Sequence, residues 1–217
     1  MSKWLTVIGM GEDGYDGISA TARLAIAEAQ HIIGSERLLR AIPDSAAHRH
    51  EWPQPFSAVI DQIKPLRGQP TIILATGDPM NYGAARKLLE FLPFKEMTII
   101  PPLSAFSLAA ARVGWSLPDC DCFTIHGRPA ANLEAYIQPN ARLLVLTQDA
   151  SSIAECARRL AARGFGSSRM TVLENMGGDR EQVTHFEAND FPAHQWSDLN
   201  TLAIHCIAGP QAKIWPR

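Results

Sequence analysis

Short apolar and β-branched runs recur along the chain, and longer segments with helical spacing separate them. The runs lie at residues 5–8, 71–74, 97–100, 123–125, 143–146, 170–173 and 202–204. Runs of this length, apolar at nearly every position, are typical of strands that are buried on both faces of a sheet.

The segments between the runs are rich in Ala, Leu and Arg. Those with apolar residues at helical spacing lie at residues 21–30, 84–91, 103–113 and 152–163. Because strands and helices alternate, the sequence predicts an α/β fold with largely parallel sheets.

The alternation weakens at residues 114–119, where Gly114 and Pro118 flank a short polar connection. We place a domain boundary there, which divides the chain into an N-terminal α/β domain at residues 1–115 and a C-terminal α/β domain at residues 116–217. The second domain is expected to contain a second sheet with fewer helices and more turns.

Composition and charge exclude several classes of protein. The chain has 217 residues, a net charge of -2 and four cysteines. It lacks the basic surface of a nucleic-acid or anionic-membrane binder, an apolar stretch of about 20 residues for a membrane span, and the cysteine density of a disulfide scaffold. We therefore expect a cytoplasmic protein with a small-molecule partner.

The first candidate loop, Gly9–Gly14, follows a predicted strand and has the spacing G-x-G-x-x-G. That spacing is found in dinucleotide-binding loops, where the pyrophosphate rests on the N-terminus of the next helix. Here three carboxylates, from Glu12, Asp13 and Asp16, stand at that position and would repel a pyrophosphate. Glu36 lies where such a fold places its ribose-binding acid, so a nicotinamide-dependent oxidoreductase stays an alternative.

Two further loops follow predicted strands. Thr76–Gly83 contains a Gly-Asp-Pro turn, and Pro101–Ser107 begins with paired prolines and leads into an alanine-rich helix. Ligands of parallel α/β sheets bind at the carboxyl ends of the strands, so both loops are well placed to contact one. Each also has a purely structural interpretation, as a helix cap behind a proline.

The order and spacing of the three loops, with the alanine-rich helix behind the third, resemble the tetrapyrrole methylase family of S-adenosylmethionine-dependent methyltransferases. In that family the loops usually read V-G-x-G-P-G-D, G-D-P-x-x-Y/F-G and P-G-x-S/T-S/A. Glu12 replaces the usual proline of the first loop, and Pro102 replaces the usual glycine of the third. The second departure removes a backbone N–H from that loop.

The C-terminal half extends the resemblance through Thr124–Arg128, Leu144–Thr147 and Val172–Glu181. These segments are similar to the branch of the family that methylates carbon 5 of a precorrin or its cobalt-containing counterpart. A methylase acting at another ring position is the alternative within the family. Some members carry a carbon-15 methyltransferase and decarboxylase on the same chain. With 217 residues, we expect that activity on a separate polypeptide here.

The resemblance implies two α/β domains with the ligand cleft between them, and homodimers. Its cofactor is S-adenosyl-L-methionine, with S-adenosyl-L-homocysteine as product, and it implies no metal. Carried onto this sequence, the donor-binding positions of the family are Gly9, Gly11, Glu12, Thr76, Gly77, Asp78, Asn81, Ser104, Ala105, Gln148 and Met176.

The tetrapyrrole acceptor carries several carboxylates, so its site is expected to contain cations. Arg128, in the segment His126–Arg128, is the first candidate, with Tyr82 and Arg112 as further candidates for binding the substrate. The macrocycle supplies the nucleophilic carbon, so the reaction does not require a strong base. His126 is the candidate for proton handling.

Overall fold

The computed structural model describes residues 3–55 and 58–215. The chain divides into two compact units, residues 1–104 and 105–217, and each is built around its own five-stranded sheet. The predicted α/β class is confirmed in both units.

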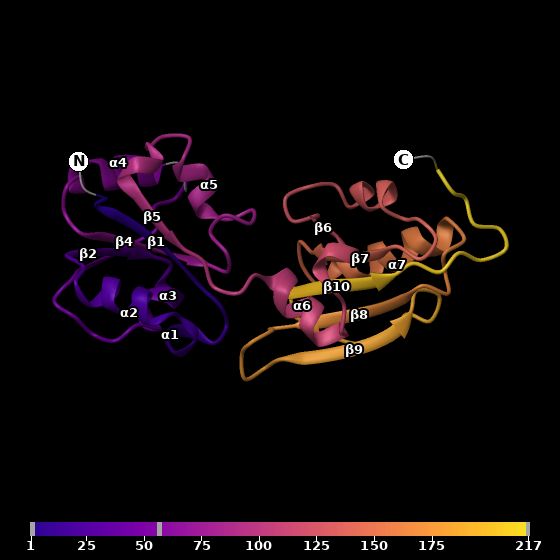
Figure 1. Ribbon diagram of the computed structural model, residues 1–217. Coiled ribbons are helices and arrows are strands. Elements are labelled where there is room, and N and C mark those ends of the chain that lie inside the picture. Colours follow the sequence, from indigo (N-terminus) through magenta and orange to yellow (C-terminus); the bar gives the residue numbers. More distant parts are fainter. Residues whose placement is uncertain (1–2, 56–57, 216–217) are drawn as a thin grey trace. The chain divides into compact units, whose positions relative to one another are not determined.

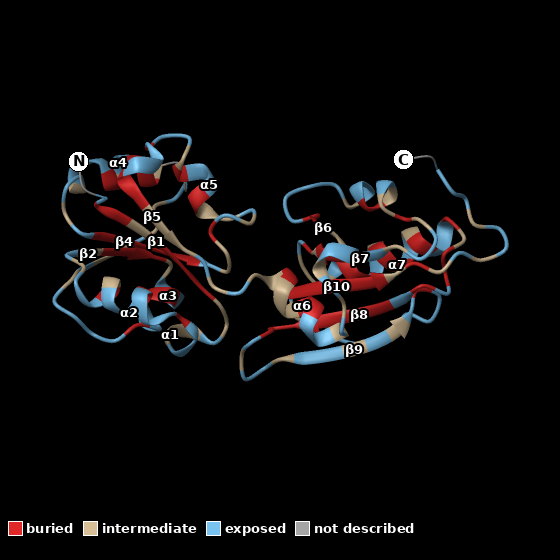
Figure 2. Cartoon of the chain, in the orientation of Figure 1, coloured by how far each residue is buried: buried red, intermediate tan, exposed pale blue. Residues whose placement is uncertain are grey.

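The sheet of the first unit is entirely parallel, as the apolar runs predict, with strand order β3-β2-β4-β1-β5. The strands are β1 (Leu5–Met10), β2 (His31–Gly34), β3 (His48–Glu51), β4 (Thr71–Thr76) and β5 (Met97–Ile100). The central strands β1 and β4 are buried along nearly their whole length (Figure 2). Helices cover both faces, which explains why these strands are apolar at successive positions.

Helices α1 (Gly14–Gly17), α2 (Ala20–Ala27) and α3 (Glu36–Arg40) lie on one face of this sheet, and α4 (Val59–Ile63) and α5 (Ala84–Leu88) lie on the other (Figure 1). Ser19 and Ser35 cap α2 and α3, each accepting a hydrogen bond from a backbone N–H three residues later. The described part of the unit also contains the 3₁₀ turns η2 (Lys64–Leu66) and η3 (Phe94–Glu96).

The second sheet corrects the prediction of largely parallel sheets. Its order is β6-β7-β10-β8-β9, and only β6 and β7 are parallel, whereas the other neighbours are antiparallel. The strands are β6 (Asp121–Thr124), β7 (Arg142–Leu146), β8 (Arg169–Glu174), β9 (Gln182–Glu187) and β10 (Asn200–His205). Because β7, β8 and β10 are also covered on both faces, their apolar runs resemble those of parallel strands.

Helix α6 (Ala105–Val113) lies on one face of the second sheet and α7 (Ser151–Ala162) on the other, with the 3₁₀ segments η4 (Leu117–Asp119) and η5 (Ala130–Ala135) at its margins. The division between the units falls before α6, whereas the sequence suggests a boundary after it. Phe106 and Ala110 of α6 pack against Leu144, Leu173 and Ala203 of the second sheet, so the helix belongs to that unit.

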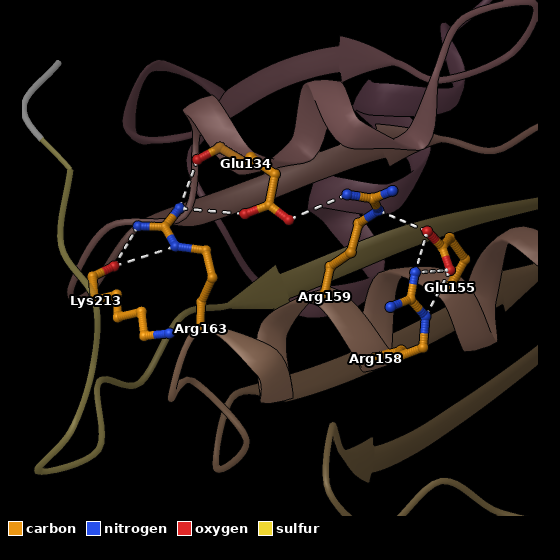
Figure 3. Close-up of polar contacts among 6 residues, drawn as sticks. All are labelled: Glu134, Glu155, Arg158, Arg159, Arg163 and Lys213. Carbon is orange, nitrogen blue, oxygen red and sulfur yellow. Dashed lines mark hydrogen bonds and ion pairs between the residues drawn. The ribbon is translucent and has the colours of Figure 1, made fainter.

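An arginine network holds the C-terminal segment against the second unit (Figure 3). The buried Arg163 donates to the carbonyl oxygens of Glu134 (2.6 Å) and Lys213 (Nε, 3.1 Å), and its guanidinium lies 4.1 Å from the centre of the Trp215 ring. Arg159, in helix α7, lies 3.2 Å from the Glu134 carboxylate.

Among the described residues, no helix is long and apolar enough to cross a membrane.

Candidate functional site

The three candidate loops emerge at one edge of the first sheet. They follow β1, β4 and β5, which are neighbours in the sheet and run in the same direction. Their carboxyl ends therefore lie side by side, which is where ligands of parallel α/β sheets bind.

Gly9 is the point at which the three loops meet. A Cβ atom on Gly9 would overlap the carbonyl oxygen of Gly77 and the ring of Pro102, and would lie 2.7 Å from Cδ of Pro79. Only a residue without a side chain permits this approach. Pro102, the departure from the family's usual third loop, is therefore part of the packing that brings the third loop onto the first.

Gly77 begins the second loop by continuing the sheet pairing. Its N–H donates to the carbonyl oxygen of Met10 at 2.7 Å, and the chain then turns with φ of +62°. A Cβ at Gly77 would meet no atom within 4 Å, so the space beside this backbone is open. The glycine is needed here for its backbone conformation.

Asp78 organises the rest of this loop. Its Oδ1 accepts a hydrogen bond from the N–H of Met80 at 2.9 Å, and its carbonyl accepts one from Asn81 at 3.2 Å. Helix α5 begins later and its N-cap is Gly83, so Asp78 does not cap it. Tyr82 is exposed and has a φ of 59°. A positive φ is uncommon for a residue with a side chain, so the surrounding loop must hold Tyr82 in this conformation.

An ion pair not anticipated from the sequence joins the first loop to the second. Arg37 Nη1 lies 2.8 Å from Glu12 Oε1, and its Nη2 lies 3.4 Å from Thr76 Oγ1. Arg37 stands in α3, directly after β2, and β2 is next to β4 in the sheet. The position of Arg37 directly after a strand is the sequence signal that could have identified it as a site residue. However, β2 is not evident as a strand in the sequence.

The first loop differs from a dinucleotide-binding turn. Gly14 has a φ of +60° and its N–H donates to the carbonyl of Gly11, but the helix that follows, α1, has only four residues. A pyrophosphate site of that kind requires the N-terminus of a full helix directly after the glycines. The geometry therefore weighs against the oxidoreductase alternative.

Ser104 and Ala105 stand at the junction of the two units. Ser104 is the last residue of the first unit, and Ala105 begins α6 in the second. Both are partly buried. The third loop is thus the connection between the sheet edge described above and the second unit.

In the second unit, β6, β7 and β8 end at the same sheet edge, because β6 is parallel to β7, and β7 and β8 are both antiparallel to β10. The segment His126–Arg128 follows β6, and Gln148 follows β7. Gln148 Oε1 accepts a hydrogen bond from the N–H of Gly127 at 2.6 Å. His126 and Arg128 are exposed beside this contact.

Met176 follows β8 and is buried against Phe106 and Ala110 of α6. Its turn is held by Glu181, which accepts a hydrogen bond from Gly177 N–H at 2.7 Å and forms two contacts with Arg112, one of them 3.0 Å. This pairing raises the pKa of Arg112, and the hydrogen bond from Arg112 lowers the pKa of Glu181. The Arg112 guanidinium thus joins α6 to the turn after β8.

The predicted residues therefore form two groups, one in each unit. The first unit brings together Gly9, Gly11, Glu12, Thr76, Gly77, Asp78 and Asn81 at one sheet edge, and the second brings His126, Arg128, Gln148 and Met176 to one edge of its sheet. Within residues 3–55 and 58–215, no three His, Cys, Asp or Glu side chains are placed to hold a metal ion.

Comparison with known proteins agrees with this architecture. Residues 4–192 match the family model described as Tetrapyrrole (Corrin/Porphyrin) Methylases. The chain belongs to the tetrapyrrole methylase family.

Among curated proteins, the chain is 39% identical over 217 residues to a decarboxylating precorrin-6Y C(5,15)-methyltransferase from Sinorhizobium sp. The match covers 100% of this chain and 52% of that protein. A cobalt-precorrin-7 C(5)-methyltransferase from Salmonella typhimurium is 29% identical over 179 residues, covering 82% of this chain and 88% of the relative. The chain thus spans about half the length of the precorrin-6Y relatives that it matches.

Among solved structures, uroporphyrin-III C-methyltransferase from Thermus thermophilus complexed with S-adenosyl homocysteine has a TM-score of 0.70 at 14% identity. It covers 93% of this chain and 96% of that one. At this level of identity the likeness concerns the fold, and it supports the two-sheet architecture.

Proposed function

We propose that the chain is an S-adenosylmethionine-dependent methyltransferase that methylates carbon 5 of a precorrin, or of its cobalt-containing counterpart, in corrin biosynthesis. The observation that carries the proposal is the packing of three loops on Gly9, at the carboxyl ends of β1, β4 and β5. Two relatives are named for methylating precorrin-6Y and cobalt-precorrin-7, and both names include carbon 5. These names support the choice of carbon 5 over another ring position.

The residues of the first unit fit a methyl donor of this kind. The open space beside Gly77 leaves loop backbone accessible, and the Asp78 carboxylate supplies negative charge near a cationic ligand. When bound, the donor supplies an electrophilic methyl group on a sulfonium. Gly11, Thr76 and the remaining donor positions named above bind and orient it in this proposal.

Arg128 and His126 of the second unit suit the acceptor. Arg128 binds a carboxylate of the macrocycle through its guanidinium, and Tyr82 contacts the acceptor from the second loop. Holding the nucleophilic carbon at about 3–3.5 Å from the methyl group lowers the barrier substantially without a strong base. His126 handles the proton that leaves the methylated carbon.

We further propose a homodimer in the cytoplasm that works with a carbon-15 methyltransferase and decarboxylase as its partner. Mixing this chain with such a partner and assaying turnover of cobalt-free and cobalt-bearing substrates tests the arrangement. Methylation of carbon 5 by this chain alone supports the assignment, whereas methylation at another ring position contradicts it.

Calorimetry with S-adenosylhomocysteine and with NADH separates the proposal from its alternative in another class. Saturable binding of S-adenosylhomocysteine, with no heat from NADH, is the expected result. Tight NADH binding without a response to S-adenosylhomocysteine would favour an oxidoreductase.

A further inference from the structure

The edge of the second sheet that carries Gln148 and Met176 rests on buried polar side chains. Strand β10 lies between β7 and β8 and runs in the opposite direction, so it begins where they end. Thr147 stands between the end of β7 and Gln148. Asn175 stands between the end of β8 and Met176, and Asn200 is the first residue of β10. Thr147, Asn175 and Asn200 are each no more than 8% exposed.

Asn200 uses both ends of its side-chain amide. Thr147 Oγ1 lies 2.8 Å from Asn200 Oδ1 and 2.8 Å from its backbone carbonyl oxygen, so the Thr147 hydroxyl donates to Asn200. On the other side, Asn200 Nδ2 donates to the carbonyl oxygen of Ser197 at 2.8 Å. Leaving a buried polar group unpaired is unfavourable, so these contacts fix the amide in one orientation. Thr147 is thereby joined to the segment that leads into β10.

Ser197 continues the connection to β8. Its N–H donates to Glu174 Oε1 at 2.6 Å, and its hydroxyl donates to Asn175 Oδ1 at 3.2 Å. The N–H of Asn175 donates to the carbonyl oxygen of Leu199 at 3.0 Å. Three hydrogen bonds therefore join the end of β8 to the segment before β10. The Asn200 network consists of Thr147, Asn200, Ser197, Glu174 and Asn175.

Asn175 also sets the direction of the chain after β8. Its φ is 47°, a conformation that asparagine adopts more readily than most residues with a side chain. Its carbonyl accepts a hydrogen bond from the N–H of Gly178 at 3.1 Å, and its Nδ2 donates to the carbonyl oxygen of Arg180 at 3.4 Å. The turn that contains Met176 and Gly177 is thus closed on Asn175.

We propose that the Asn200 network is a positioning device for the donor site, which holds Gln148 and Met176 in fixed positions relative to each other. The inference rests on the proposed function, in which both are donor-binding residues. The network ends on β7 and β8, which β10 separates, so a change at Thr147 is transmitted to Met176 across that strand. Residues that are already held in place bind a ligand more tightly, because binding does not have to order them.

Calorimetry of the full chain with S-adenosylhomocysteine tests the network from both ends. Thr147→Val keeps the shape of the side chain but removes the hydroxyl, and we expect binding to weaken about threefold to tenfold, as for one lost neutral hydrogen bond. Thr147→Ser keeps the hydroxyl and should restore most of the affinity. Ser197→Ala should weaken binding as Thr147→Val does. The two losses should combine less than additively, because both variants interrupt the same network.

Hydrogen exchange followed by mass spectrometry provides a readout without ligand. Thr147→Val should speed exchange at residues 175–181, on the far side of β10. Ser168→Ala is the matched control, because Ser168 is fully buried and its Oγ accepts a hydrogen bond from the N–H of Ile207 at 2.9 Å, at the opposite end of β8. The control should lose stability but keep the parent's affinity and its exchange at residues 175–181.

Two outcomes would overturn the inference and leave the proposed function intact. One is parent affinity in both Thr147→Val and Ser197→Ala, with unchanged exchange at residues 175–181. The other is an equal loss of affinity in Ser168→Ala, because general destabilisation would then explain the effect. Failure of the parent chain itself to bind S-adenosylhomocysteine would contradict the proposed function and overturn the donor-site role with it.

Discussion

Arg37 Nη1 lies 2.8 Å from Glu12 Oε1, and the same guanidinium reaches Thr76 in the neighbouring loop. The Glu12 side chain is 17% exposed and that of Arg37 is 54% exposed. A partly exposed pair of this kind adds little to global stability, at most about 1 kcal/mol. The pair instead holds the first and second loops of the candidate donor site in fixed positions relative to each other.

Arg37→Met is therefore expected to weaken S-adenosylhomocysteine binding several-fold while the free energy of unfolding changes by less than about 1 kcal/mol. Arg40→Met, on the same helix and paired with Glu36, provides the control and should change neither quantity. Calorimetry and urea unfolding measure the two effects. Unchanged affinity in Arg37→Met would show that the loops hold their positions without this pair.

Gly9→Ala introduces a Cβ atom into the contact with Gly77, Pro79 and Pro102. The loops must separate to accommodate it, so we expect a loss of about 1–3 kcal/mol of stability and a marked loss of donor affinity. Gly68→Ala is the control, because Gly68 has open space beside it and lies away from the three loops; unlike Gly9 it has a positive φ, +89°, so the added Cβ there costs backbone strain alone. The control should lose some stability and keep donor affinity.

The pair formed by Arg112 and Glu181 predicts a pH dependence. Hydrogen bonds from Arg112 and then from Gly177 N–H lower the pKa of Glu181 from its ordinary value of 4.5. The stabilisation is complete above that value and disappears as the pH falls through the lower folded-state pKa. Glu181→Gln should therefore be less stable than the parent at pH 7, and the difference in urea midpoint should vanish in acid. A constant difference would mean that the charge of Glu181 is not responsible.

Three histidines on β2 and β3 predict a second pH effect. His31 Nδ1 lies 3.2 Å from His50 Nε2, and the His48 ring is stacked on His31. Burial, then His31 and His48, lower the pKa of His50 below 6.5. The unfolded chain therefore binds that proton more readily, so stability is full above pH 6.5 and falls as the pH drops below it.

His50→Asn should flatten this dependence between pH 8 and pH 5.5, as measured by urea unfolding. The substitution keeps a polar side chain on β3 but removes the titrating group. If the variant loses stability with acidification as steeply as the parent, other groups cause the effect.

Arg128→Ala should weaken binding of the tetrapyrrole and leave S-adenosylhomocysteine affinity intact, because Arg128 is an exposed residue at the edge of the second sheet. Fluorescence or absorbance titration with the tetrapyrrole, and calorimetry with S-adenosylhomocysteine, measure the two affinities. Arg158→Ala, on α7, is a control that removes an exposed arginine from the same unit. Loss of both affinities would indicate misfolding.

The apolar runs identify most of the core strands, because the central strands are covered on both faces and carry apolar residues without interruption. Strands β2, β3 and β9 are not evident in the sequence. β3 and β9 stand at sheet edges and carry polar residues such as His48 and Gln182, and β2 has only two large apolar residues, between His31 and Gly34. The position of these strands in the fold is set by hydrogen bonding to a neighbouring strand. Backbone pairing of this kind does not require an apolar run in the sequence.

The sequence by itself determined the α/β class, the three glycine- and proline-rich loops and their resemblance to tetrapyrrole methylases, because turns and buried strands leave local patterns. Only the tertiary structure decided the mixed direction of the second sheet, the meeting of the loops at Gly9, and the pairs that join Arg37 to Glu12 and Arg112 to Glu181. These relationships connect residues far apart in the chain, so no local pattern encodes them.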